Sequence, residues 1–319
     1  MDPHNSSSNL QSSDYVFQLA ASSGDEGNAG VVFAARASGL LRSRDNGHTW
    51  ESAYESLRLR QALPTSAVVL SPDFGHDRTV FAGLNGALLR SHDGGGTWQR
   101  CRLPSPPPAI SALSISPQFG EDESLFAGTN EDGVLKSSDG GRNWVTWNFG
   151  LLDLNILCLA VSPEFSKDET LFAGTGSGLF RSTNGGRAWK EVPLPFDFDA
   201  VLSLAISPTF ARDGTVYAGT ENNGLLISID QGRSWRVLGD DTCREPVNLI
   251  AFLPLSSGKQ DLIIASGAQP LVSKDHGATW KSWHVSQISG KDVTTLLPGD
   301  GSERATLAGF SDGSIRQIR

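Results

Sequence analysis

Hydrophobic and polar residues alternate in short runs along this chain, and the runs recur in a fixed order. Residues 156–193 show the unit, which reads ILCLAVS, PEFSKDE, TLFAGT, GSG, LFRS, TNGGRAW and KEV. Short apolar runs separated by glycine-rich turns predict β-strands, and four of them in succession predict an antiparallel meander.

A second pattern gives the period of this unit. Six segments share the form Ser-x-Asp-x-Gly-x-Thr-Trp with small departures, and successive segments lie 45 to 48 residues apart. Four-stranded units at this spacing are typical of the blades of a β-propeller. The tryptophans that end these boxes are Trp50, Trp98, Trp144, Trp189, Trp235 and Trp280. Their acidic position holds Asp45, Asp93, Asp139, Asn184, Asp230 and Asp275.

The repeats predict an all-β protein consisting of a single seven-bladed propeller, with six blades as the alternative. ATLAGF and SDGSIRQI near the end of the chain copy only the second and third strands of a blade. The last blade is therefore expected to have three strands, with a fourth either missing or supplied by residues before Tyr15. A polar tail of residues 1–14 precedes the propeller. The predicted blades cover about residues 15–54, 66–102, 110–148, 156–193, 200–238, 246–284 and 292–319.

The residue types that recur in the boxes have a structural explanation. An Asp or Asn side chain can accept hydrogen bonds from its own turn, glycine adopts a positive φ, and tryptophan can pack between blades. Four loops of the form Ser-Pro-x-Phe each end in one Asp, unlike the alternating carboxylates of a calcium loop. The histidines lack zinc-ligand spacing, so we expect no metal and no cofactor.

Charge and composition narrow the classes of partner. The formal net charge of −9 disfavours nucleic acid and anionic membrane surfaces as partners. No apolar run approaches the roughly 20 residues that span a bilayer. The three cysteines, Cys101, Cys158 and Cys243, are an odd number at unrelated repeat positions, and the polar start of the chain does not look like a signal peptide. A cytoplasmic protein without disulfides is the expectation.

The boxes SRDNGHTW, SHDGGGTW and SSDGGRNW, and the three that follow them, resemble those of the BNR or Asp-box repeat family over nearly the whole chain. That family includes sialidases, xyloglucanase-type glycoside hydrolases, sortilin-like receptors and the photosystem II stability and assembly factor. The resemblance implies the propeller fold. It implies no particular activity, because the box recurs in enzymes and in binding proteins alike.

The sequence departs from the enzymatic members of that family. Sialidase-like enzymes use an arginine triad and a tyrosine nucleophile with a neighbouring acid, but all three tyrosines here fall at predicted strand positions. The recurring cations just before the box serine indicate a repeated structural feature rather than a converging triad; these are Arg42, Arg90 and Arg181, with Lys136 in the third blade. We therefore predict a non-catalytic member, with a glycoside hydrolase as the main enzymatic alternative.

Sequence variation within the repeats concentrates in the turns between second and third strands and in the loops between blades. These loops should share one face of the propeller, opposite the boxes, and they combine apolar with acidic residues. The candidate contact residues are Phe149, Leu151, Asp153, Phe196, Asp197, Phe198, Asp199, Asp240, Asp241, Glu131, Asp132 and Glu221.

The predicted function is a scaffold or assembly subunit that docks another protein on this face. Charge reversal at Asp197 and Asp199 is expected to weaken that binding. The alternatives are a carbohydrate-active protein that uses acids on the same face and an assembly factor resembling the photosystem II one.

Overall fold

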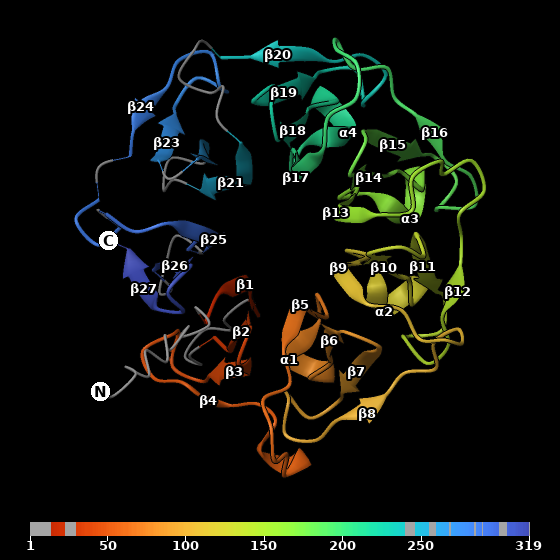
Figure 1. Ribbon diagram of the computed structural model, residues 1–319, viewed down its shortest axis with the longest axis vertical. Coiled ribbons are helices and arrows are strands. Elements are labelled where there is room, and N and C mark those ends of the chain that lie inside the picture. Colours follow the sequence, from red (N-terminus) through yellow and green to blue (C-terminus); the bar gives the residue numbers. More distant parts are fainter. Residues whose placement is uncertain are drawn as a thin grey trace, which may run out of the picture.

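The computed structural model describes residues 14–22, 30–239, 246–254, 260–267, 269–283, 285–288, 290–299 and 305–318. Its strands form seven antiparallel sheets arranged radially around a central axis, six of four strands and one of three (Figure 1). The predicted seven-bladed β-propeller is therefore confirmed, and the six-bladed alternative is wrong.

Each blade begins at the axis and adds its strands outward in chain order (Figure 1). The innermost strands are β1 (Val16–Ala21), β5 (Thr65–Leu70), β9 (Ile110–Ile115), β13 (Ile156–Val161), β17 (Val201–Ile206), β21 (Val247–Pro254) and β25 (Val293–Leu297). The second strands are β2 (Val32–Arg36), β6 (Val80–Leu84), β10 (Leu125–Thr129), β14 (Leu171–Thr175), β18 (Val216–Thr220), β22 (Gln260–Ser266) and β26 (Thr306–Phe310).

The outer half of each blade is shorter. The third strands are β3 (Gly39–Ser43), β7 (Ala87–Ser91), β11 (Val134–Ser137), β15 (Leu179–Ser182), β19 (Leu225–Ser228), β23 (Gln269–Ser273) and β27 (Ile315–Ile318). The outermost strands are β4 (Glu51–Ser52), β8 (Gln99–Arg100), β12 (Val145–Thr146), β16 (Lys190–Glu191), β20 (Arg236–Leu238) and β24 (Lys281–Ser282).

Five of the seven second strands carry an Ala-Gly pair, which has a packing explanation. The pair is buried, and the glycine faces the innermost strand of the next blade. A Cβ at Gly128 would lie 2.5 Å from Cγ2 of Ile156, far inside van der Waals contact. Glycine therefore sets how closely adjacent blades approach near the axis.

Each Ser-Pro-x-Phe segment contains one helical turn, where the sequence indicated only a loop. The turns are α1 (Phe74–Asp77), α2 (Phe119–Asp122), α3 (Phe165–Asp168) and α4 (Phe210–Asp213), and a 3₁₀ turn, η1 (Glu55–Leu57), follows the first blade. The phenylalanine of the helical turn packs edge-on against an aromatic of the preceding blade. In the pair Phe81–Phe119 the ring centroids are 6.0 Å apart.

The ring closes by contact between the innermost strands β1 and β25. Thr294 Oγ1 donates to the Val16 carbonyl at 2.6 Å, and the Leu19 N–H donates to Thr295 Oγ1 at 3.4 Å. Blade 7 consists of β25, β26 and β27 in the described part of the chain. A strand contributed by residues before Tyr15 would involve residues 1–13, which lie outside the described residues.

No helix within the described ranges is long and apolar enough to cross a membrane. The same ranges hold no group of three or more His, Cys, Asp and Glu side chains arranged to bind a metal ion.

Candidate partner-binding surface

The propeller has two chemically different faces. On one, the box hairpins of blades 2 to 5 contact the end of the helical turn of their own blade, as in the hydrogen bond from Gly94 N to the Arg78 carbonyl at 2.9 Å. On the other, the turns between second and third strands contact the loops between blades. Gly133 N, for example, donates to the Leu154 carbonyl at 3.0 Å. This is the division of loops expected from the strand order.

The box aspartates are committed to their own turns. Asp93 accepts hydrogen bonds from Ser91 Oγ, Gly96 N, and Thr97 N and Oγ1, at 2.7 to 2.8 Å. Partial burial raises the pKa of Asp93, but the bonds from Thr97, Ser91 and Gly96 outweigh burial and lower it to about 2. The carboxylate is therefore used within the hairpin.

The indole N–H groups of two box tryptophans, Trp98 and Trp189, bond to the preceding blade. Trp98 packs edge-on against Tyr54 of the preceding blade with ring centroids 5.4 Å apart, and its indole N–H donates to the Ala53 carbonyl at 2.7 Å. Burial of the ring and a satisfied N–H make the tryptophan an inter-blade anchor.

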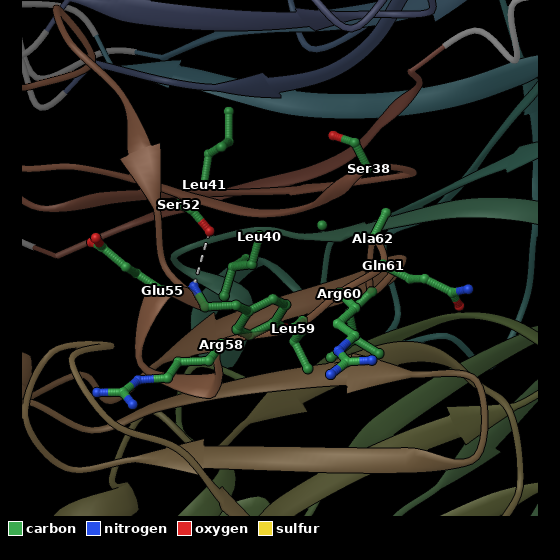
Figure 2. Close-up of a pocket in the computed structure, with 13 residues that line it drawn as sticks. Ser38, Leu40, Leu41, Ser52, Glu55, Arg58, Leu59, Arg60, Gln61 and Ala62 are labelled. Carbon is green, nitrogen blue, oxygen red and sulfur yellow. Dashed lines mark hydrogen bonds between the residues drawn. The ribbon is translucent and has the colours of Figure 1, made fainter.

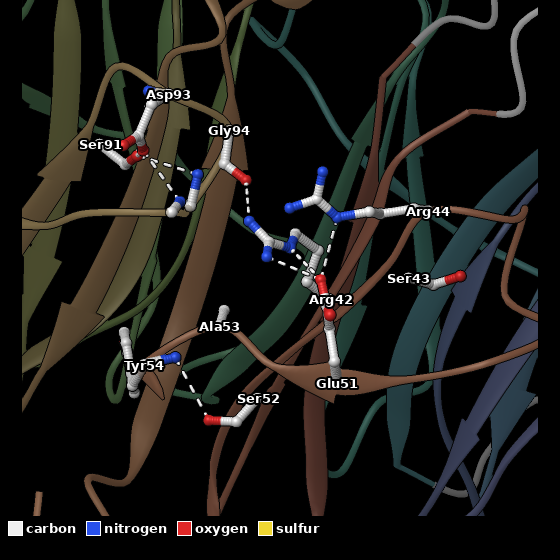
Figure 3. Close-up of polar contacts among 12 residues, drawn as sticks. Arg42, Ser43, Arg44, Glu51, Ser52, Ala53, Tyr54, Ser91, Asp93 and Gly94 are labelled. Carbon is white, nitrogen blue, oxygen red and sulfur yellow. Dashed lines mark hydrogen bonds and ion pairs between the residues drawn. The ribbon is translucent and has the colours of Figure 1, made fainter. Parts of the chain in front are cut away.

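The recurring cation also connects blades (Figure 3). Arg42 Nη1 donates to the carbonyl of Gly94 in the next blade at 2.6 Å, and Glu51 on the adjacent strand accepts from Arg42 Nε and Nη2 at 2.9 and 2.7 Å. The same inter-blade contact recurs twice, from Arg90 to the Gly140 carbonyl and from Lys136 to the Gly185 carbonyl. These side chains belong to the packing between blades rather than to a substrate site.

The loop of residues 147–155, which passes beside the fourth box, presents two large apolar side chains to solvent. Phe149 is 80% exposed and Leu152 is also exposed, although the backbone around them is held in place. The Phe149 carbonyl accepts from Trp189 N at 2.8 Å. The rest of the loop is anchored by Asn148, whose amide accepts from Val134 N at 2.9 Å.

Two predicted contact residues in this loop face inward instead. Leu151 is buried in the core of blade 4, so the structure corrects its assignment to an accessible surface. Asp153 is half-buried and accepts from Asn155 N at 2.9 Å and from Ser177 Oγ at 2.8 Å. Its carboxylate fixes the loop to the turn of blade 4.

The next loop, residues 193–200, repeats this arrangement. Phe198 is 85% exposed and Asp197 is exposed, whereas Phe196 is half-buried against the core of blade 5. Asp199 is only 4% exposed and accepts from the backbone and side-chain amides of Asn222 and Asn223. Its assignment to an exposed charge is corrected, because those bonds hold the loop onto the neighbouring turn.

The two loops flank one turn of blade 4. Ser177 in that turn binds Asp153 of the first loop, and it also lines a pocket of about 380 Å³ with Phe196, Asp197 and Phe198 of the second loop. We refer to Phe149, Leu152, Asp197 and Phe198 as the exposed loop patch. Glu131, Asp132 and Glu221 are exposed in the turns beside these loops, while Asp240 and Asp241 lie outside the described residues.

A groove that sequence analysis did not identify lies between blade 1 and the linker that leads to blade 2. It has a volume of about 480 Å³ and is formed by the end of blade 1 and the loop that follows η1 (Figure 2). Arg58, Leu59 and Arg60 are exposed along it. The unusual length of the linker at residues 54–65 is the sequence signal that could have indicated it.

Together these observations define a β-propeller whose box aspartates are occupied by their own hydrogen bonds and whose inter-blade loops expose apolar side chains. No known family matches this sequence, and no curated protein matches it either. Among solved structures, the extracellular domain of the putative one-component system BT4673 from B. thetaiotaomicron is similar, with a TM-score of 0.72 and 16% identity. The match covers 96% of this chain and 38% of that one.

Two other solved propellers are also similar. YCF48 bound to D1 peptide aligns with a TM-score of 0.68 and 18% identity over 97% of this chain and 93% of YCF48. The GH74 xyloglucanase from Xanthomonas campestris aligns with a TM-score of 0.70 and 14% identity over 95% of this chain and 52% of the enzyme. At these identities the similarity establishes the fold alone.

Proposed function

We propose that this protein is a non-catalytic propeller that docks a partner protein on the exposed loop patch. The observation that carries the proposal is the exposure of Phe149 and Phe198, 80% and 85%, on loops whose backbones are fixed by hydrogen bonds. Large apolar side chains held rigidly in water favour association, because burying them costs little conformational entropy and removes apolar area from solvent.

The charge around the patch indicates the chemistry of the partner. Asp197 lies between Phe196 and Phe198 in the sequence of the second loop. Three further acidic residues are exposed in the adjoining turns: Glu131, Asp132 and Glu221. An apolar centre with an acidic rim suits a partner segment that carries apolar residues flanked by Lys or Arg. The solved complex of YCF48 with D1 peptide is an example of a propeller of similar fold that binds a peptide.

The carbohydrate-active alternative receives less support from the same site. A glycosidase acid needs a raised pKa so that it can donate a proton. Asp199, the buried carboxylate of the pocket, has the opposite shift: burial raises its pKa, but the bonds from Asn223 and Asn222 outweigh burial and lower it. A carboxylate held ionised in this way anchors a loop and is a poor general acid.

The test compares binding by three forms of the protein. Wild type, F149S/F198S and the matched control I229S would each be used as bait in the native host, since Ile229 is 65% exposed but lies on the box face. A partner retained by wild type and I229S but lost by F149S/F198S supports the proposal. A partner retained equally by all three, with the double variant folded, contradicts it.

A further inference from the structure

The junction between blades 4 and 5 contains two cations that lack the partners present at equivalent positions elsewhere. The first of these cations is Arg181, the recurring cation of blade 4. The residue that faces this recurring cation from the outermost strand differs among blades. Arg42 faces Glu51 and forms an ion pair with it, whereas Arg181 faces Lys190. Like charges directly opposite each other on adjacent strands repel, so this blade replaces an attraction with a repulsion.

The second cation is Arg233 in the fifth box. In the two preceding boxes the equivalent arginine reaches a glutamate that follows the helical turn, as in the ion pair of Arg187 with Glu169 at 2.9 Å. In blade 5 that position is Gly214, which follows α4. The Arg233 side chain has no carboxylate partner within the described residues.

Arg181 also lacks the inter-blade bond of its counterparts. Arg42, Arg90 and Lys136 each donate to a carbonyl of the next blade's box. Within the described structure the Arg181 guanidinium makes no hydrogen bond, and its Nε is buried without a partner. Burial and the nearby charge of Arg233 lower the pKa of Arg181, and they outweigh the opposite effect of the Asp168 and Asp230 carboxylates.

These cations line one crevice. It has a volume of about 460 Å³, and its walls include Arg181, Lys190 and Arg233 together with the apolar surfaces of Trp189 and Val192. Glu191 is its one carboxylate. The fourth box carries Asn184 where the other five carry Asp, which removes a further negative charge from the same wall. A cluster of unpaired cations is unusual on a chain with a net charge of −9.

We propose that this crevice is a binding site for a carboxylate attached to an apolar group, with the Arg181 guanidinium as its main donor. A planar guanidinium matches a carboxylate through paired N–H donors, and Lys190 and Arg233 supply additional positive charge. The indole of Trp189 and the side chain of Val192 provide the apolar contact. The crevice adjoins the exposed loop patch, because it shares Glu191, Val192 and Pro193 with the pocket beside that patch. Its test uses the isolated chain and does not depend on the proposed docking function.

The experiment is a titration of the isolated full chain with benzoate at constant ionic strength, followed through the Arg Nε–Hε signals in nuclear magnetic resonance spectra. We expect saturable binding by wild type, at least a tenfold loss in R181Q, and at least a tenfold loss in K190E. The K190E variant recreates the Arg42–Glu51 arrangement and should also raise the melting temperature, so it reports on the site even if R181Q folds poorly.

The matched control is R100Q, which removes the same charge from an exposed position on β8. Its affinity should stay within twofold of wild type. Absence of saturable binding by wild type, or equal binding by wild type and K190E, would overturn the proposal. Inorganic phosphate is the comparison ligand, and binding of phosphate without benzoate would overturn the assignment to a carboxylate.

Discussion

At the residue scale, the box carboxylates show how a charged group can be used entirely within one turn. Asp93 accepts hydrogen bonds from two backbone N–H groups and two hydroxyls. It caps the hairpin turn in the way that an N-cap residue caps a helix. Asn184 keeps the same acceptor role in the fourth box, accepting from Ser182 Oγ and Ala188 N at 2.9 Å. The turn therefore needs an oxygen at this position more than it needs a charge.

Replacing this carboxylate should lower stability in a way that depends on pH. D93A should lower the free energy of unfolding at pH 7 by about 1–2 kcal/mol, by analogy with lost helix caps, and D93N by less. The folded pKa of about 2 lies below the unfolded value of about 3.9, so the carboxylate stabilises the fold above pH 4, and this contribution is lost as pH falls through 2. Urea titrations between pH 7 and pH 2 measure both effects; equal stability of D93A and wild type at pH 7 would rule out the capping role.

The two described cysteines should be unreactive. Both are free thiols, and burial raises the pKa of Cys101 and of Cys158 to about 12. The reactive thiolate is therefore scarce at pH 8. In a C243S variant, which removes the third cysteine, both thiols should label slowly with a disulfide reagent when folded and rapidly in denaturant. Fast labelling of the folded variant would contradict this.

At the scale of elements, a glycine allows the box hairpin to pack closely against the preceding blade. Gly141 has a φ of +83°, and a Cβ there would lie 2.2 Å from Cε1 of Phe81 in the preceding blade. The glycine is required twice, once by its backbone conformation and once by the aromatic ring beneath it.

A glycine pair in the same blade tests this. G141A should destabilise the protein by about 1–3 kcal/mol, the usual cost of overpacking, with backbone strain added. The control is G120A, because a Cβ at Gly120 of α2 meets nothing within 4 Å; it should be neutral or stabilising by up to about 1 kcal/mol. Thermal unfolding distinguishes the two, and similar losses in both variants would disprove the packing argument.

At the scale of the whole molecule, the ring closes with the bonding that joins its internal blades. Ser111 Oγ donates to the Ile156 carbonyl at 2.6 Å between blades 3 and 4. Thr294 Oγ1 donates to the Val16 carbonyl at the same distance across the closure, joining residues 278 positions apart. The innermost strand of blade 7 is therefore bound to that of blade 1 by the same kind of hydrogen bond that joins the innermost strands of blades 3 and 4.

Because these two hydrogen bonds are alike, removing either one should lower the free energy of unfolding by a similar amount. T294V and S111A should each lower the free energy of unfolding by about 1 kcal/mol, the net value of one such hydrogen bond. Calorimetry should show a single transition in both, because the closure is not a weak joint. An additional early transition in T294V alone would show that blade 7 separates first.

The fold was predictable from the sequence because its signals are local and repeated. The box residues bond within a few positions of one another, as in the turn of Asp93, and the blade spacing repeats along the chain. The candidate surface was predictable only in outline. Phe149 and Leu151 are both apolar residues of one loop, and Asp197 and Asp199 are both acidic residues of the next, yet one of each pair is exposed and the other is buried.

Sequence by itself thus determined the strands and the turn chemistry, since each depends on neighbouring residues, whereas the choice between seven and six blades required the assembled ring. Tertiary structure decided which loop residues meet solvent and which cations find partners, because both depend on residues of the adjacent blade. Asp199 is buried by Asn222 and Asn223 of the adjacent blade, and within the described residues Arg181 lacks the bond to the next blade that Arg42 makes to Gly94. Those contacts exist only once the ring has assembled.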